Sequence, residues 1–110
     1  MIRAECFVFS QVSDEGWMDA CAGPLLRYRK QIGAERVAIL ADIKKKHCAH
    51  AVTADVSLAE TAQAAEFFGA DGVVITGEAT GRAASIEDLK SMLPMVAMVP
   101  MVGLWSVWSP

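Results

Sequence analysis

The feature that most constrains the fold of this chain is a recurrence of strand-like apolar segments. Such segments begin at Ala4, Val37 and Gly72, and each is separated from the next by about the length of one strand–helix unit. The spacing predicts consecutive βα units and therefore a parallel α/β sheet. Because α/β folds of this kind place their sites at the carboxyl ends of the strands, the residues that follow each segment are the first candidates for a ligand site.

Composition limits the classes of protein to which the chain can belong. Its 110 residues are 54% hydrophobic and 21% charged, which is typical of a single globular domain or less. The formal net charge is −3 and the only basic cluster is three lysines, so we expect no nucleic acid partner. We also expect no cofactor.

The cysteines and the N-terminus bear on the compartment. Cys6, Cys21 and Cys48 are odd in number and form no C-x-x-C pair, so no disulfide framework is implied and a reducing compartment fits best. The first five residues carry an acid and do not resemble a secretory signal. We expect a cytoplasmic protein, or one inside an organelle if a leader is missing.

The first half of the chain predicts one βα unit and the start of the next. We expect a strand over residues 4–10, a loop over residues 11–16 and a helix over residues 17–32 that is ended by Gly33. Pro24 fits the first turn of a helix better than its middle, so an alternative is that the ordered helix begins near Gly23.

The second half continues the pattern. A strand over residues 37–43 is followed by a polar stretch and then by Ser57 and Glu60, which match a helix capping box. That helix is expected to end at Gly69. A buried strand over residues 73–76 and a short helix from Ser85 to about residue 93 complete the series.

The last 20 residues carry no charge. Pro94, Pro100 and Gly103 interrupt this segment, which argues against a membrane span. We expect residues 95–102 to form a buried strand followed by a tail that no helix covers, with a membrane tail or disorder as alternatives. The domain division that we expect is therefore residues 1–93 and residues 94–110.

The strand end at Asp42 and Lys44 is the strongest candidate site. Side chains alternate across a strand, so these two residues share one face. The pair could supply a carboxylate base or metal ligand and an ammonium that holds a phosphate or polarises a carbonyl. The alternative is a solvated charge run from Lys44 to Lys46, and for Lys45 alone that interpretation is favoured.

Three further residues with ligand chemistry follow this strand. His47, Cys48 and His50 could bind a metal if Asp42 or Glu5 approached, but the spacing is not a standard zinc signature, so we expect no metal site. His47 fits better as a general acid or hydrogen-bond donor. The alternative is a loop histidine without chemistry.

The third strand end is a candidate phosphate loop. Thr76, Gly77, Thr80 and Gly81 place hydroxyls and unhindered amides where an anion would dock, although a plain turn explains the glycines equally well. An unpaired Glu5 within the first strand would be costly, so it belongs either to the ligand site or to an ion pair with Arg3 or Lys44.

Four motifs resemble one known family. Residues 25–30, 41–47, 54–58 and 74–81, in this order and spacing, resemble the BtpA family over residues 1–93. The resemblance implies an α/β fold, a (β/α)8 TIM barrel related to the ribulose-phosphate-binding barrels. It also implies a link with photosystem I, since the cyanobacterial member is associated with biogenesis and stability of that complex. The resemblance supplies no catalytic residue.

The chain departs from a complete barrel. Such a barrel needs about 250 residues and eight βα units, whereas this chain offers about three units plus one strand, corresponding to strands four to seven. Residues 102–108 stand where the family has a Gly-Ser-Gly type phosphate loop. An open parallel sheet has unpaired edges, so we expect the chain alone to aggregate, form a homo-oligomer or stay partly unfolded.

These observations favour one function and leave two alternatives. In the parent barrel, a small phosphorylated or anionic ligand would bind at the carboxyl strand ends, lined by Asp42, Lys44, His47, Thr76 and Gly77. If the barrel is catalytic, Asp42 is the acid or base, Lys44 the anion or carbonyl anchor and His47 a proton donor. The alternatives are a non-catalytic assembly or stability factor, which would meet a membrane only through a partner complex, and an inactive truncated product.

Overall fold

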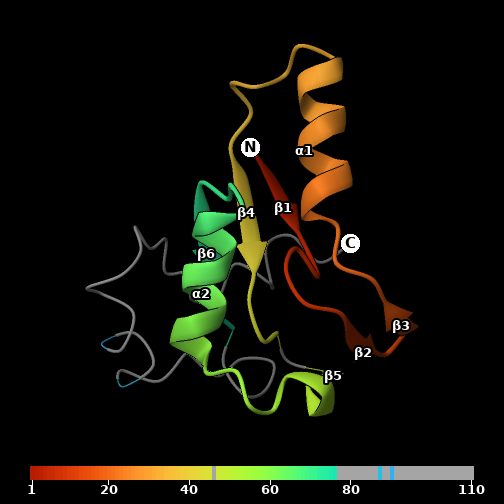
Figure 1. The fold of residues 1–110 in the computed structure, drawn as a ribbon, viewed down its shortest axis with the longest axis vertical. Coiled ribbons are helices and arrows are strands. Elements are labelled where there is room, and N and C mark those ends of the chain that lie inside the picture. The colour runs from red at the N-terminus through yellow and green to blue at the C-terminus, as the bar shows by residue number, and fades with distance from the viewer. Residues whose placement is uncertain (46, 77–86, 88–89, 91–110) are drawn as a thin grey trace.

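The computed structural model describes residues 1–45, 47–76, 87 and 90, and within them it shows two three-stranded sheets and two α-helices (Figure 1). The parallel sheet contains β1 (Ile2–Ala4), β4 (Ile39–Asp42) and β6 (Gly72–Val74). Helix α1 (Ala22–Gln31) lies between β1 and β4 along the chain, and helix α2 (Leu58–Phe67) lies between β4 and β6.

The order of the parallel strands follows the order of the chain. Ile2 of β1 lies opposite Ile39 of β4, and Leu40 of β4 lies opposite Gly72 of β6. Each strand therefore pairs with the next one after a helical connection. The prediction of consecutive βα units is confirmed for the two units that the structure describes completely.

Both helices pack on the same face of this sheet. The core cluster includes Ile39, Ala41 and Ile43 at alternate positions of the β4 segment, and it also includes Ala62 and Ala65 of α2. Two leucines of α1, Leu25 and Leu26, pack against the same cluster. Because side chains alternate along a strand, the residues between these core positions face away from the helices.

The second sheet is antiparallel, with the order β3-β2-β5. It contains β2 (Gln11–Ser13), β3 (Gly16–Met18) and β5 (Cys48–Ala49), and a short 3-10 helix η1 (Ala51–Thr53) follows it. β2 and β3 come from the segment after β1, and β5 comes from the segment after β4. The arrowhead of β4 points toward this small sheet (Figure 1), so the sheet lies beyond the carboxyl ends of the parallel strands.

Two predictions for the first unit are wrong. The strand expected over residues 4–10 is β1, which lies earlier and ends at Ala4. The backbone turns into the left-handed region at Cys6, with φ of 51°, and again at Phe9, with φ of 61°. Phe7 is fully buried in the core without belonging to a strand. The loop expected over residues 11–16 contains β2 and the first residue of β3.

The helix predictions are closer to the structure. A start at Trp17 is wrong because Trp17 lies in β3, whereas the alternative start near Gly23 agrees within one residue with α1. The capping box of α2 is confirmed: the Ser57 side chain accepts from the backbone N–H of Glu60 at 3.1 Å, and the Glu60 carboxylate accepts from the Ser57 N–H at 2.8 Å. Helix α2 ends at Phe67, two residues before the predicted end at Gly69, where φ is 98°.

The later strands are shorter than predicted. The strand expected over residues 37–43 is β4, and the one expected over residues 73–76 is β6, which begins one residue earlier and ends at Val74. The helix from Ser85 lies outside the described residues except for Glu87 and Lys90, and so do residues 94–110. Among the described residues, no helix has the length and apolar character needed to cross a membrane.

Candidate functional site

A buried ion pair joins β1 and β4 at their carboxyl ends. Arg3 donates from Nε to Oδ2 of Asp42 and from a terminal guanidinium nitrogen to Oδ1, both at 2.8 Å. The side chain of Asp42 is only 1% exposed, and that of Arg3 is 27% exposed. The pair lies on the face away from the helices, because Arg3 is opposite Leu40 in the register and Asp42 is two positions after Leu40, on the same face of β4. This bidentate geometry fixes the Asp42 carboxylate.

Burial and hydrogen bonding act in opposite directions on Asp42. Burial raises the pKa of the Asp42 carboxyl above its usual value, and the hydrogen bonds and charge of Arg3 offset part of that rise. The same hydrogen bonding to Asp42 raises the pKa of Arg3, which stays charged. The pKa of Asp42 therefore reflects two opposing effects: burial raises it, and the neighbouring Arg3 cation lowers it.

A second ion pair links the segments that follow the same two strands. Lys45 Nζ lies 2.9 Å from Oε2 of Glu5, and the Lys45 side chain is 13% exposed. Burial lowers the pKa of Lys45, but the hydrogen bond and charge of Glu5 outweigh burial and raise it. The expectation that Glu5 needs a partner is confirmed, but the partners named from the sequence are wrong, and the expectation that Lys45 is merely solvated is wrong too.

Lys44 differs from the other two cations at this end of the sheet. Its Nζ donates to the carbonyl oxygen of Thr53 at 2.9 Å. Among the described residues, no carboxylate forms an ion pair with it. Lys44 thus brings a positive charge to the site that is held by a backbone carbonyl rather than neutralised.

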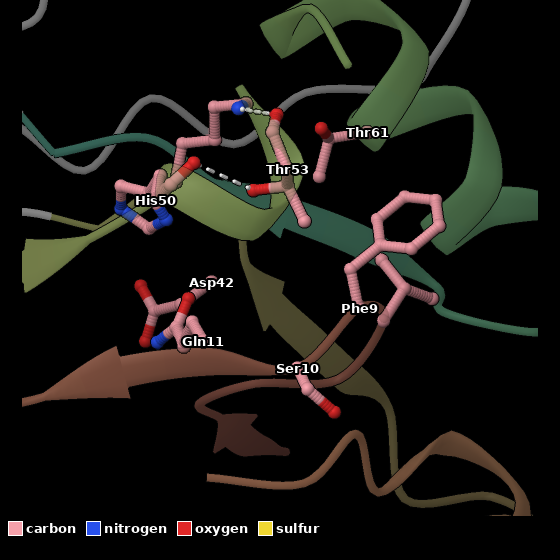
Figure 2. Close-up of a pocket in the computed structure, with 9 residues that line it drawn as sticks. Phe9, Ser10, Gln11, Asp42, His50, Thr53 and Thr61 are labelled. Carbon is pink, nitrogen blue, oxygen red and sulfur yellow. Dashed lines mark hydrogen bonds between the residues drawn. The ribbon is translucent and has the colours of Figure 1, made fainter. Parts of the chain in front are cut away.

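Asp42 and Lys44 line the same small pocket (Figure 2). Gln11 comes to this pocket from β2, His50 and Thr53 from the segment after β5, and Thr61 from α2. The remaining lining residues are Val8, Phe9 and Ser10 from the segment after β1. Its interior has room for about one water molecule. The prediction that Asp42 and Lys44 share one face of a strand stays a prediction, because β4 ends at Asp42 and Lys44 has a positive φ of 41°.

The polar groups of the pocket are held in place by local hydrogen bonds. Nε2 of Gln11 donates to Sγ of Cys48 at 3.4 Å, and Oγ1 of Thr61 donates to the Ser57 carbonyl at 2.8 Å. The His50 ring nitrogen Nε2 lies 2.9 Å from the carbonyl oxygen of Lys45. Gln11 and Thr61 are buried. These side chains keep oxygen or nitrogen atoms that can hydrogen-bond to a ligand.

Among the described residues, Glu5, His47 and Thr76 do not line this pocket. His47 is exposed, and it is His50 that lines the pocket. Thr76 follows β6 and is half-buried. Gly77, Thr80 and Gly81 lie outside the described residues. The catalytic roles given to Asp42, Lys44 and His47 stay predictions.

Backbone strain gathers at the same end of the sheet. Within the described part of the chain, four residues other than glycine have positive φ: Cys6, Phe9, Lys44 and His47. Two of them follow β1 and two follow β4. Such conformations cost of order 1 kcal/mol or more each and concentrate at functional sites. Two of these four residues, Phe9 and Lys44, line the pocket.

Sequence reasoning missed several residues of the site. Arg3 was considered only as a partner for Glu5, and Gln11, His50 and Thr61 were not assigned to the site. Arg3 lies beside the end of β4 because of the parallel register between β1 and β4, which comes from the structure. Gln11 lies in β2 of the small sheet, His50 follows β5 of that sheet, and Thr61 comes from α2, so the three residues come together only through tertiary structure.

The fold and the site define a class of protein. Parallel strands in chain order, helices on one face and polar residues collected at the carboxyl ends are typical of α/β proteins that bind small ligands there. The sequence model of the BtpA family matches residues 1–105. The chain belongs to the BtpA family, as its motifs suggested.

Similar proteins come from distant organisms. An uncharacterized protein of Caenorhabditis elegans, labelled mitochondrial, is 62% identical over 88 residues, which are 80% of this chain and 32% of that protein. The photosystem I biogenesis protein BtpA of Synechocystis is 36% identical over 89 residues, 81% of this chain and 30% of its own. An uncharacterized protein of Archaeoglobus fulgidus is 38% identical over 81% of this chain and 34% of its own.

The chain thus spans about a third of the length of these relatives. No solved structure matches it significantly. Among the described residues, no group of three histidine, cysteine or acidic side chains is arranged to hold a metal ion.

Proposed function

We propose that this chain is part of a (β/α)8 barrel of the BtpA family and that its carboxyl strand ends contribute to the binding of a small phosphorylated or anionic ligand. Lys44 would hold the anionic group. Asp42, fixed by Arg3, would accept hydrogen bonds from the ligand or exchange a proton with it.

The strand order supports the barrel. In a doubly wound sheet the strand order reverses and helices lie on both faces. Here the order β1-β4-β6 follows the chain, and α1 and α2 pack against one face, as successive units of a barrel do. Arg3 and Asp42 lie on the opposite face, which is the interior side in a barrel.

One observation carries the ligand proposal: Asp42 and Lys44 line one pocket at the carboxyl ends, and the Lys44 ammonium donates to the Thr53 carbonyl, with no carboxylate partner in the described part of the chain. Among the described residues, the charges of the two ion pairs cancel, and Lys44 adds a further positive charge to the site. A phosphate or carboxylate oxygen would replace the carbonyl as acceptor and form a stronger, charge-assisted hydrogen bond.

The size of the pocket adds a condition. A sugar phosphate is far larger than one water molecule, so Lys44 would have to leave Thr53 and open the pocket toward the ligand. The rest of the site would come from parts of the full-length relatives that this chain does not span.

The test is ligand-dependent thermal stability of the complete chain. Unfolding temperatures are measured with inorganic phosphate and with a panel of sugar phosphates. A ligand at about 100 times its dissociation constant stabilises the folded state by about 2.7 kcal/mol, which raises Tm by several degrees. We expect this rise to be lost in Lys44→Met and in Asp42→Asn.

The matched control is Lys30→Met, which removes the same charge from an exposed position of α1. This variant should keep the full ligand-dependent rise. A Tm that no ligand of the panel changes, or a rise that survives in Lys44→Met, would refute the proposal.

The name of the Synechocystis relative favours a second candidate function, a non-catalytic assembly or stability factor. In that case the chain acts by contact with a partner, and the charged strand ends serve stability alone. The double variant Asp42→Asn, Lys44→Met separates the two functions, because it should lose ligand binding but keep the partner in co-purification.

The compartment is a further part of the proposal. The mitochondrial label of the Caenorhabditis relative supports an organelle interior over the cytoplasm, and free thiols at Cys6, Cys21 and Cys48 suit a reducing compartment of either kind. Fractionation of cells that express the full-length gene with a C-terminal tag tests this directly.

A further inference from the structure

The outer face of the small antiparallel sheet is apolar and exposed. Val12 of β2 lies opposite Trp17 of β3 and also opposite Ala49 of β5. Residues opposite one another in a sheet point to the same side, so these three side chains form one surface, the Trp17 face. Trp17 is 58% exposed and Val12 is 41% exposed, so this surface presents two large apolar side chains to solvent.

The Trp17 side chain is held in a defined position. Its indole Nε1 donates to Oδ1 of Asp19 at 3.0 Å. The ring therefore needs to lose little rotamer freedom when it is covered, which lowers the entropic cost of binding. An aromatic side chain presented in this way is the kind of residue that dominates binding energy at protein interfaces.

Exposed acids lie at the two ends of the β2–β3 hairpin, beside the Trp17 face. Asp14 and Glu15 form the turn between β2 and β3, and Asp19 follows β3; all three are exposed. The Ser13 hydroxyl orders the turn by accepting from the Glu15 N–H at 3.1 Å. Among the described residues, none of these carboxylates forms an ion pair. The rim therefore presents negative charge to solvent.

We propose that the Trp17 face is a docking surface for a segment of another protein that carries apolar side chains flanked by lysine or arginine. The apolar centre supplies buried area, and the acidic rim selects a basic partner and speeds its encounter. The same rim would repel an anionic membrane surface.

Docking here leaves the ligand pocket open. Gln11 and Cys48 alternate with Val12 and Ala49 along their strands and so face the opposite side of the small sheet, where Gln11 lines the pocket. The two surfaces are the two sides of one sheet. The docking proposal therefore stands independently of the ligand proposal.

The test uses two labelled peptides of 12 residues, one alternating leucine and lysine and one alternating leucine and glutamate, and fluorescence anisotropy with the complete chain. We expect the lysine peptide to bind and the glutamate peptide to bind at least tenfold more weakly. Trp17→Ser should weaken binding of the lysine peptide by about tenfold or more. Trp17→Phe, which keeps an aromatic ring, should restore most of it.

Charge reversal separates docking at this face from attraction to the net negative charge of the chain. Asp14→Lys with Glu15→Lys should reverse the preference in favour of the glutamate peptide. The control Glu35→Lys with Glu66→Lys makes the same change in net charge at exposed positions elsewhere and should leave the preference unchanged. The proposal is wrong if both double variants behave alike, or if Trp17→Ser binds the lysine peptide as well as the unmodified chain does.

Discussion

At the scale of single residues, the carboxylate of Asp42 decides much of the chemistry at the candidate site. Its side chain is 1% exposed, whereas Glu5, the acid of the neighbouring ion pair, is 38% exposed. A buried carboxylate is tolerated only when it is paired and hydrogen-bonded, and Arg3 satisfies both oxygens. Arg3 thus positions Asp42 and also keeps it compatible with folding.

Loss of Arg3 should therefore destabilise the fold strongly. Arg3→Met leaves the Asp42 carboxylate buried without its cation. We expect the free energy of unfolding in urea to fall by about 3 kcal/mol. This value is at the lower end of the range for broken buried ion pairs, because the Arg3 side chain is partly exposed to water. Arg27→Met, at an exposed position of α1, should cost less than about 0.5 kcal/mol. Equal costs for the two variants would mean that the ion pair contributes nothing.

The raised pKa of Asp42 predicts a pH dependence with a defined sign. The folded chain holds the Asp42 proton more tightly than the unfolded chain does, for which the usual value is 3.8. The contribution of Asp42 to the free energy of unfolding is therefore largest below that value and falls as the pH rises through the folded-state pKa. Arg3→Met removes the opposing hydrogen bonds, so the fall should become larger.

Urea unfolding between about pH 3.5 and about pH 7 measures this effect, with Asp42→Asn as the reference that lacks the titration. Relative to Asp42→Asn, the unmodified chain should lose stability over the lower part of this range, and Arg3→Met should lose more. If the stability of the unmodified chain relative to Asp42→Asn instead rises with pH, the assigned direction of the Asp42 pKa shift is wrong.

The residues of the site were predictable from the sequence only where one strand carries the information. The apolar run that ends at Asp42 marks the carboxyl end of β4, and both Asp42 and Lys44 line the pocket there, although Lys44 lies beyond the strand. The partners of Asp42 and Glu5 lie about 40 positions away along the chain. They depend on the register between β1 and β4, which the sequence does not display.

At the scale of elements, local signals and long-range pairing behave differently. The capping box at Ser57 and the glycine at position 69 define α2 within the chain itself, and that helix was predicted closely. β2 and β3 have only three residues each, and β2 also pairs with β5 from a distant segment. The apolar run at residues 6–9 supplies Phe7 to the core, and its burial rather than strand pairing explains its composition.

The contact between α1 and the end of α2 gives a prediction at this scale. Gly69 has φ of 98°, and a Cβ there would lie 2.9 Å from Cδ1 of Leu26. Gly33 also has positive φ, 69°, but a Cβ there would have no neighbour within 4 Å. Each alanine substitution should cost about 1 kcal/mol from the backbone, and Gly69→Ala should cost about 0.5–1 kcal/mol more because Leu26 must shift.

Chemical denaturation of the two variants measures the difference. Gly33→Ala serves as the control that carries the backbone effect without the contact. If both variants lose the same stability, the contact between a side chain at position 69 and Leu26 has no energetic cost, and this prediction is wrong.

At the scale of the whole molecule, the candidate site lies where the parallel sheet meets the small sheet. The strands β1, β4 and β6 end there, the antiparallel sheet covers that end, and four strained residues follow the strand ends (Figure 1). The chain spans about a third of its relatives, so the complete site is expected to combine this end with further strands.

The most direct test of the central claim is a map of where an anion binds. Backbone amide NMR spectra of the complete chain are recorded during a titration with inorganic phosphate and with the sugar phosphate that raises Tm most. The account predicts that the signals that shift belong to the carboxyl end of the sheet, above all to Gln11, Lys44, His50 and Thr61. Shifts confined to the opposite end, around Ala34 and Asp71, or the absence of any shift, would contradict it.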